Sequence, residues 1–198
     1  MEKNTLVVGV ALLLIGLGIG YAFGGREPRV GSHMMPSGSM MSDESMLGQN
    51  IDQHFIMQMI PHHEGAIEMA KIALQKSARP EVKTLANAII EAQTKEIDDM
   101  TTWYQAWFDS APPHMSGMMH MDGMSGDTSR LAAASAAEFD REFLSQMIPH
   151  HEMAIMMAQM LKATTGRAEM KQLGENIISS QSAEITTMRG WLQEWYRN

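Results

Sequence analysis

The chain contains an internal duplication. An ungapped offset of 88 residues aligns Ile51–Phe108 with Phe139–Tyr196, and 26 of the 58 aligned positions are identical. Apolar residues recur in both copies at the spacing of amphipathic helices, and strand-like alternation is lacking. A small helical unit cannot bury its apolar face by itself, so each copy is expected to bury this face against the other copy. The duplication therefore predicts two similar units packed together about a pseudo-twofold axis.

Each copy is predicted to be a helical hairpin. In the first copy the helical spacing starts near Ile51 and stops at Ser77–Arg79, and Pro80 then resets the chain. A second helix is predicted over about residues 81–108. In the second copy the break falls at Thr164–Gly166, where a glycine suits the end of a helix. The predicted fold class is all-α, a four-helix bundle made of two repeated hairpins.

Both copies keep the motif Met-Ile-Pro-His-His-Glu, at residues 59–64 and 147–152. The chain has 22 methionines and no cysteine, which excludes disulfides and thiolate metal sites. Paired imidazoles with nearby thioethers are a soft ligand set, and copper is the metal that suits them best. The proline of each motif removes a backbone donor, so it predicts either a kink or a new helix start just before the histidines.

Helical geometry predicts how the motif side chains project. At about 100° per residue, His62 and Met69 point within roughly 20° of one another, and Met59 shares a face with His63. The two adjacent histidines diverge by about 100°, so one motif is not a ready-made chelate. Each motif is instead predicted to supply half of two sites shared with a neighbouring helix or the other copy. The equivalent pairs in the second copy are His150 with Met157 and Met147 with His151.

The second helix of each hairpin offers a carboxylate for the histidines. Glu96 and Glu184 occupy equivalent positions on the helix stripe that also carries tryptophans. A glutamate on such a stripe is costly unless it is paired. Metal-bound histidines usually donate their second ring nitrogen to a carboxylate or carbonyl. Glu96 and Glu184 are therefore predicted to orient the histidines, with a solvated helix edge as the alternative.

Two segments are rich in glycine, serine, proline and methionine: a tether at residues 26–49 and a linker at residues 111–137. They separate a first repeat at 50–110 from a second at 138–198. The tether and residues 111–129 of the linker have no hydrophobic periodicity, so both stretches are predicted to be disordered without a ligand. Methionine has no packing role there, which favours weak capture of Cu(I) or Ag(I). The candidate ligands in these segments are His33, His114, Met118, Met119, His120 and Met121.

The N-terminal residues 1–25 contain an apolar run from about Leu6 to Phe23. Its length of roughly 18 residues reaches the lower limit for a helix that spans a bilayer. No clear cleavage site follows it, so an uncleaved membrane anchor is predicted, with the bundle outside the cytoplasm. Secretion after signal cleavage is the alternative. The net charge of -8 gives no basic footprint for nucleic acid.

These patterns resemble a known family. Asp-x-x-Phe-x-x-x-Met-Ile-Pro-His-His-x-x-Ala-x-x-Met-Ala, followed by Gln-x-x-Glu-Ile-x-x-Met-x-x-Trp, is similar to domain of unknown function family 305 over both repeats, roughly residues 50–198. The resemblance implies a ferritin-like helical bundle, a periplasmic location, copper binding and copper tolerance. The ligands it implies are the flanking methionines together with His62, His63, His150 and His151.

The two copies differ at positions close to the motif. His54 aligns with Glu142, and Gly65 aligns with Met153. The second copy is also richer in thioether than the first. His54 and Met153 are therefore candidate ligands without an equivalent in the other copy, and the equivalence of the two halves stays open.

The sequence thus predicts a copper-binding protein that sequesters or buffers Cu(I), and Ag(I) as an alternative ion, without catalysis. Two other functions are kept. One is a copper- or iron-dependent oxidoreductase on a ferritin-like bundle, although the paired Glu-x-x-His motifs of di-iron sites are absent from the histidine pairs. The other is a membrane-tethered interaction module with incidental metal affinity. A metal-exchange partner protein and a homo-oligomer both stay open.

Overall fold

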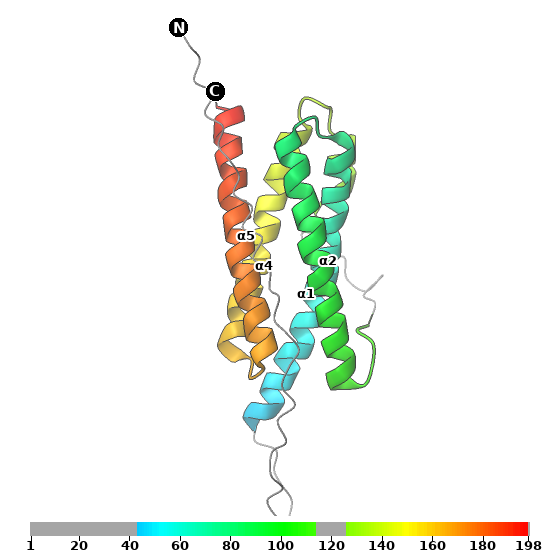
Figure 1. Ribbon diagram of the computed structural model, residues 1–198, viewed down its shortest axis with the longest axis vertical. Helices are drawn as coiled ribbons and strands as arrows, with labels where there is room; N and C mark the ends of the chain where they lie inside the picture. Colours follow the sequence, from blue (N-terminus) through cyan, green and yellow to red (C-terminus); the bar gives the residue numbers. More distant parts are fainter. Residues whose placement is uncertain (1–42, 114–125, 198) are drawn as a thin grey trace, which may run out of the picture. The chain divides into compact units, whose positions relative to one another are not determined.

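The computed structural model describes residues 43–113 and 126–197, and the side chains from residue 51 onward. Within these residues the chain is helical and contains no strand. The helices are α1 (Asp43–Lys76), α2 (Pro80–Phe108), α3 (Thr128–Ala133), α4 (Phe139–Thr164) and α5 (Ala168–Trp195) (Figure 1). The predicted all-α bundle is confirmed.

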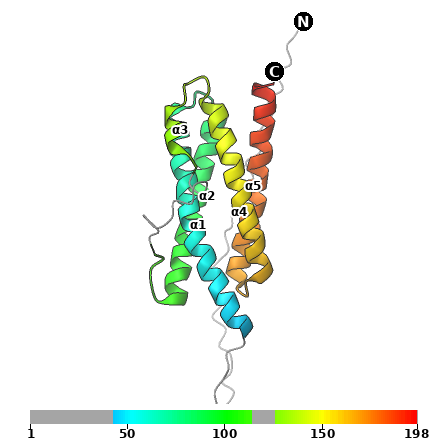
Figure 2. The ribbon, with the colours of Figure 1, turned by 180° about the vertical axis from the view of Figure 1, so that it is seen from behind.

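Four long helices form two hairpins. α1 packs along α2, α4 packs along α5, and the two hairpins meet through α1 and α4. The views in Figures 1 and 2 show α1 and α4 running in opposite directions at this junction. The pseudo-twofold axis expected from the duplication therefore passes between these two helices.

The turn within each hairpin is set by a buried hydroxyl group. Ser77 Oγ accepts a hydrogen bond of 3.1 Å from the backbone N–H of Arg79, and Thr165 Oγ1 accepts one of 3.1 Å from that of Arg167. Both arginines have extended backbone conformations before the next helix. Pro80 begins α2 in the first copy, but alanine does so in the second. The hydroxyl is therefore the feature that both turns share.

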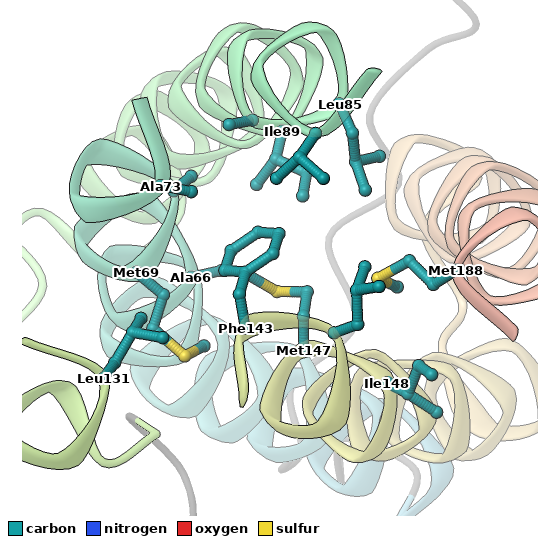
Figure 3. Packing of buried hydrophobic residues seen from close by; sticks show 14 of the residues in the cluster. Ala66, Met69, Ala73, Leu85, Ile89, Leu131, Phe143, Met147, Ile148 and Met188 are labelled. Atoms are coloured by element: carbon teal, nitrogen blue, oxygen red, sulfur yellow. The ribbon is translucent and has the colours of Figure 1, made fainter. Parts of the chain in front are cut away.

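The apolar core has two clusters related by the duplication. The first joins the C-terminal half of α1 to the N-terminal half of α4, and the second joins the opposite halves of the same helices. Figure 3 shows Phe143 and Met147 of α4 pointing toward Leu85 and Ile89 of α2 in the first cluster. Met147 is fully buried there, and Met59 is its buried counterpart in the second cluster.

Two arginines hold the hairpins together at opposite ends. Arg79 lies 3.3 Å from the carboxylate of Asp140, and its guanidinium lies 4.0 Å from the ring centre of Trp195. In the other copy, Arg167 lies 3.2 Å from Asp52 and its guanidinium lies 4.0 Å from the ring centre of Trp107. Each arginine thus leaves its own hairpin to contact the other one. We call these two contacts the arginine clamps.

The linker predicted at residues 111–137 contains a helix, α3. Leu131 of α3 is fully buried in the first cluster, and Asp127 caps the helix by accepting a 2.8 Å hydrogen bond from the N–H of Arg130. Gly126 has a φ of 69°, and a Cβ at this position would overlap the sulfur of Met69. α3 therefore lies inside the predicted linker and begins at the last two residues of the stretch that was predicted to be disordered, 128 and 129. The residues of α3 are ordered because they cover the buried Met69.

The motif prolines do not start new helices. Pro61 and Pro149 lie inside α1 and α4, which continue through them. Gly166 follows α4 without a left-handed conformation, so its predicted role at the helix end is not needed. α1 begins at Asp43, earlier than the predicted start near residue 51.

No helix in residues 43–113 or 126–197 has an apolar stretch of the length and hydropathy required to cross a membrane. The predicted anchor at residues 1–25 and most of the predicted tether lie outside the described residues.

Candidate metal centre

The four motif histidines lie together in the middle of the bundle, where α1 contacts α4. Their exposed fractions are 1% for His62, 0% for His63, 3% for His150 and 0% for His151. The rings of His62 and His150 face each other across the two helices, with their centres 3.7 Å apart and their planes inclined by 39°. The two motifs therefore meet directly through these imidazoles, and a metal site shared between the two copies stays a prediction.

The adjacent histidines of each motif point in different directions, as helical geometry requires. The ring centres of His62 and His63 are 6.2 Å apart, and those of His150 and His151 are 6.3 Å apart. The second ring of each motif turns toward the other helix of its own hairpin. His63 meets α2 there, and His151 meets α5.

A glutamate lies against each of these outer rings. His63 Nε2 is 2.7 Å from Glu96 Oε2, and His151 Nε2 is 2.7 Å from Glu184 Oε2. These are the two neighbours predicted from the sequence, and their action on a bound metal stays a prediction. In the tautomer that donates from Nε2 to the glutamate, Nδ1 is the ring nitrogen that can bind a metal ion.

The remaining nitrogen of each outer ring carries the lone pair in this tautomer. The Nδ1 atoms of His63 and His151 are buried and have no hydrogen-bond partner among the residues that the structure describes. A buried acceptor without a donor is unfavourable, and a metal ion is one group that would satisfy it. Carboxylate, imidazole and metal in this order is the usual arrangement around a metal-bound histidine.

The inner ring of His62 is held in its neutral form. Burial is the largest cause that lowers the pKa of His62 from 6.5 to about 2, and the neighbouring His150, His63 and His151 contribute the rest of this shift. A neutral imidazole is the state that can give a lone pair to a metal ion.

The metal-free protein is expected to lose stability as the pH falls below about 6.5. The unfolded chain protonates His62 near pH 6.5, whereas the folded chain resists protonation down to about pH 2. Stability is therefore fully present above pH 6.5 and falls by up to about 1.4 kcal/mol per pH unit below it. Denaturant unfolding at pH 5.0, 6.0 and 7.0 measures this slope. His62→Gln is expected to flatten it, and an unchanged slope in that variant would contradict the assignment.

Two glutamines belong to the same buried region. Gln93 and Gln181 are each 3% exposed, and the Oε1 atom of each lacks a hydrogen-bond partner within the described chain. They stand three residues before Glu96 and Glu184 on α2 and α5. From the sequence, a role beside the histidines is predicted for the glutamates alone. The presence of glutamine at this position in both copies is the sequence signal that would have placed Gln93 and Gln181 beside the histidines as well.

The methionines proposed as ligands fall into different environments. Met59 and Met147 are fully buried one helical turn before His63 and His151, within the two core clusters. Met69 is also fully buried, but its sulfur lies against Gly126 beneath α3. The structure therefore gives Met69 a packing role, which angular projection along one helix did not foresee.

The candidate ligands specific to one copy lie nearer the surface. His54 is exposed, and its Nε2 accepts a 2.9 Å hydrogen bond from the amide of Gln58. Met153 and Met157 are half-buried. The candidates in the methionine-rich segments lie outside the described residues: His33, His114, Met118, Met119, His120 and Met121.

No group of three histidine, aspartate or glutamate side chains in residues 51–113 and 126–197 is arranged to hold a metal ion. A metal ion in these residues would therefore draw on imidazoles and thioethers as ligands.

The fold and the site together define a class of protein, a duplicated helical hairpin with an internal histidine cluster that is braced by carboxylates. The chain belongs to the DUF305 family, whose description is domain of unknown function, because the family model matches residues 52–196. The resemblance noted in the sequence is thus confirmed.

Solved structures of similar proteins share this fold. CopM in its Cu(I)-bound form is 51% identical, with a TM-score of 0.67 over 74% of this chain and 98% of that chain. CopM in its Cu(II)-bound form is 54% identical, with a TM-score of 0.69 over 73% and 97%. A DUF305 fragment from Deinococcus radiodurans is 26% identical, with a TM-score of 0.62 over 73% and 96%.

A shorter similarity is found in an uncharacterized protein, L153, of Acanthamoeba polyphaga mimivirus. The two chains are 44% identical over 55 residues, which is 28% of this chain and 36% of the viral protein. The match therefore spans about one third of that relative.

Proposed function

We propose that this chain is an extracytoplasmic protein that binds copper, chiefly as Cu(I), and sequesters or buffers it for copper tolerance. The observation that carries the proposal is the pair of buried Nδ1 atoms on His63 and His151, each opposite a carboxylate-bound Nε2. Similarity to CopM, whose structures include Cu(I)-, Cu(II)- and Ag-bound forms, supports copper as the ion.

Charge balance at the site also supports a cation. Glu96 and Glu184 lie largely inside the bundle, with side chains 15% and 20% exposed, and each contacts a histidine that is 0% exposed. Negative charge at such depth is unfavourable without a positive partner. One Cu(I) ion beside each outer ring would balance the two carboxylates. Imidazole is a suitable donor, and the buried Met59 and Met147, four residues before His63 and His151, are candidate thioether donors.

The proposed role is binding rather than catalysis. A copper oxidase needs a coordination position that a substrate reaches. All four histidines are at most 3% exposed, so an ion held by them is enclosed by the bundle. Enclosure favours retention of the ion, which suits sequestration or buffering.

Two parts of the proposal are supported by the sequence: the location of the bundle outside the cytoplasm, and the weak capture of copper by the methionine-rich segments. The apolar run within residues 1–25 supports an anchor that leaves the bundle outside the cytoplasm. The methionines of residues 26–42 and 114–125 supply additional soft donors for weak capture.

Cu(I) titration under reducing conditions, in competition with a coloured chelator, tests the proposal. We expect tight binding by the wild type, loss of tight binding when all four motif histidines become glutamine, and retention of tight binding when every methionine of residues 26–42 and 114–125 becomes serine. The second change stops before Gly126 because that residue covers the core. Circular dichroism of each variant establishes that it is folded.

The opposite pattern would favour another function. If the histidine variant kept its tight sites and the methionine variant lost them, the bundle would be a structural module whose copper is held by the segments. Steady consumption of oxygen by the copper-loaded wild type would instead favour an oxidoreductase.

Glu96→Gln is expected to weaken Cu(I) binding by about 10–100-fold, the usual effect of removing a group that orients a metal-bound histidine. The substitution keeps the shape of the side chain but removes the charge that faces His63 Nε2. Competition with the chelator measures the change. The matched control is Glu91→Gln, which alters the same charge on an exposed position of α2. Equal losses in both variants would contradict a local role for Glu96.

A further inference from the structure

α4 carries a stripe of methionines on its surface. Met153, Met156, Met157 and Met160 are spaced at i, i+3, i+4 and i+7, so they share one face of the helix. Met156 is 53% exposed and Met160 is 60% exposed, and they are the exposed large apolar side chains of the described chain. Side chains this exposed contribute little to core packing, so packing of the fold does not explain why these positions are methionine.

The same face of the other repeat is built differently. Met69 is the counterpart of Met157, and it is buried beneath Gly126 and α3. The counterparts of Met156 and Met160 are Glu68 and Ile72. Among the described residues, only the first repeat therefore has its methionine covered, and the second repeat presents thioethers at the surface.

His54 of α1 lies at the level of this stripe. The contact between His62 and His150 fixes the register of the two antiparallel helices. Eight residues before His62 is His54, and eight residues after His150 is Ala158. Phe55 and Ala158 belong to the same core cluster, as this register requires. The exposed His54 is therefore level with residues 157–160 of α4.

The pseudo-twofold relation places His54 on the same side as the stripe. In one half, Gln146 Oε1 accepts a 2.8 Å hydrogen bond from the N–H of Asp127, and the neighbouring Gly126 lies against Met69. Gln146 of α4 and Met69 of α1 thus lie against the same short segment, residues 126–127. The pseudo-twofold axis carries this pair onto Gln58 and Met157. Gln58 is the residue that donates to His54. We therefore infer that His54 lies on the same side of the bundle as Met157.

We propose that His54, Met157 and Met160 form a second soft-metal site on the surface of the bundle, which takes Cu(I) or Ag(I). One imidazole and two thioethers are a suitable set for a monovalent soft ion, which accepts low coordination numbers. The ion replaces the Gln58 amide at His54 Nε2 or uses the other ring nitrogen. Met153 and Met156 extend the same stripe with alternative thioethers.

The surface site and the histidine cluster differ in how quickly a bound ion exchanges with the solvent. It is open to solvent, whereas the cluster is enclosed, so an ion held at the surface leaves and enters more quickly. It shares with the proposed function only the identity of the ion. The surface site does not require that the buried histidines bind metal.

Titration of the full chain in detergent with Ag(I) tests the site, with methionine methyl groups labelled with carbon-13 and observed by NMR. The surface variant Met156→Leu, Met157→Leu, Met160→Leu assigns the relevant methyl signals and removes the thioethers while keeping apolar bulk. We expect these signals to shift with Ag(I) in the wild type. Native mass spectrometry is expected to show one bound ion fewer in the surface variant. In the NMR titration, His54→Gln is expected to raise the Ag(I) concentration that gives half of the shift by about 10-fold or more.

Two further variants separate the possible outcomes. Met170→Leu changes a fully buried methionine of α5 and is expected to keep the wild-type number of ions. In the buried-site variant His63→Gln, His151→Gln, the surface methyl signals are expected to shift with Ag(I) as in the wild type. The surface site can therefore be confirmed even if the buried histidines do not bind copper. Surface signals that ignore Ag(I), an unchanged ion count in the surface variant, or shifts that follow protein concentration without Ag(I) would overturn the site. The last result would identify a docking face between copies.

Discussion

Saturation with Cu(I) is expected to raise the melting temperature of the wild-type bundle by about 8–16 °C. An ion present at about 1,000 times its dissociation constant stabilises the folded state by about 4.1 kcal/mol, and each kcal/mol corresponds to about 2–4 °C for a chain of this size. The site exists only when α1, α2, α4 and α5 are assembled, because its ligands and carboxylates come from all four helices. Differential scanning calorimetry with and without a Cu(I) chelator measures the shift.

The double variant His63→Gln, His151→Gln is expected to lose most of this stabilisation. Glutamine keeps an amide that can donate to Glu96 and Glu184, but it removes the Nδ1 lone pair from each ring position. The melting temperature of the metal-free variant should therefore stay near that of the metal-free wild type, while the rise on adding copper disappears. A copper-dependent rise equal to that of the wild type would show that the ion is bound elsewhere in the chain.

Arg167→Ala is expected to destabilise the bundle by about 3–5 kcal/mol, the usual loss when one partner of a buried ion pair is removed. The Asp52 side chain is 2% exposed, and burial already raises its pKa above 3.8 despite the contact with Arg167. Without the guanidinium the carboxylate is left in the bundle with no compensating charge, and the ring of Trp107 also loses its cover. Urea denaturation at pH 7 gives the change in the free energy of unfolding.

Matched substitutions isolate this effect. Lys95→Ala breaks the exposed pair with Asp99 and is expected to change stability by less than about 0.5 kcal/mol. Arg79→Ala removes the other arginine clamp, and its effect is expected to be smaller because the Asp140 side chain is 10% exposed. Adding Asp52→Asn to Arg167→Ala should recover part of the loss. No recovery would indicate that packing on the tryptophan, rather than charge, holds the clamp.

The features predicted from the sequence are those fixed by local spacing and by the duplication. Helical periodicity located the four long helices. The 100° separation of adjacent positions indicated that His62 and His63 point apart, and the equal spacing in both copies singled out Glu96 and Glu184. Each of these inferences needs only the geometry of one helix and the knowledge that a second copy exists.

The features that the sequence did not predict depend on contacts between distant segments. α3 is too short to show periodicity, and it is ordered because Leu131 enters the core and Gly126 fits against Met69. The burial of Met69 follows from that cover and not from its own helix. Likewise, Pro80 and Gly166 were the residues that predicted the positions of the turns. The feature that the two turns share is instead the buried hydroxyl of Ser77 or Thr165, which no local pattern indicates.

The arginine clamps bear on how such a chain arises. Every clamp contact from the first hairpin to the second is matched by one in the reverse direction, which is the isologous pattern of a twofold homodimer. Two identical single hairpins would satisfy the same contacts by pairing with each other. Joining them in one polypeptide removes the requirement that both surfaces stay alike. Within the described residues, the methionine of one copy is covered by α3, whereas the other copy presents a row of exposed sulfur, a difference that a homodimer of identical hairpins could not have.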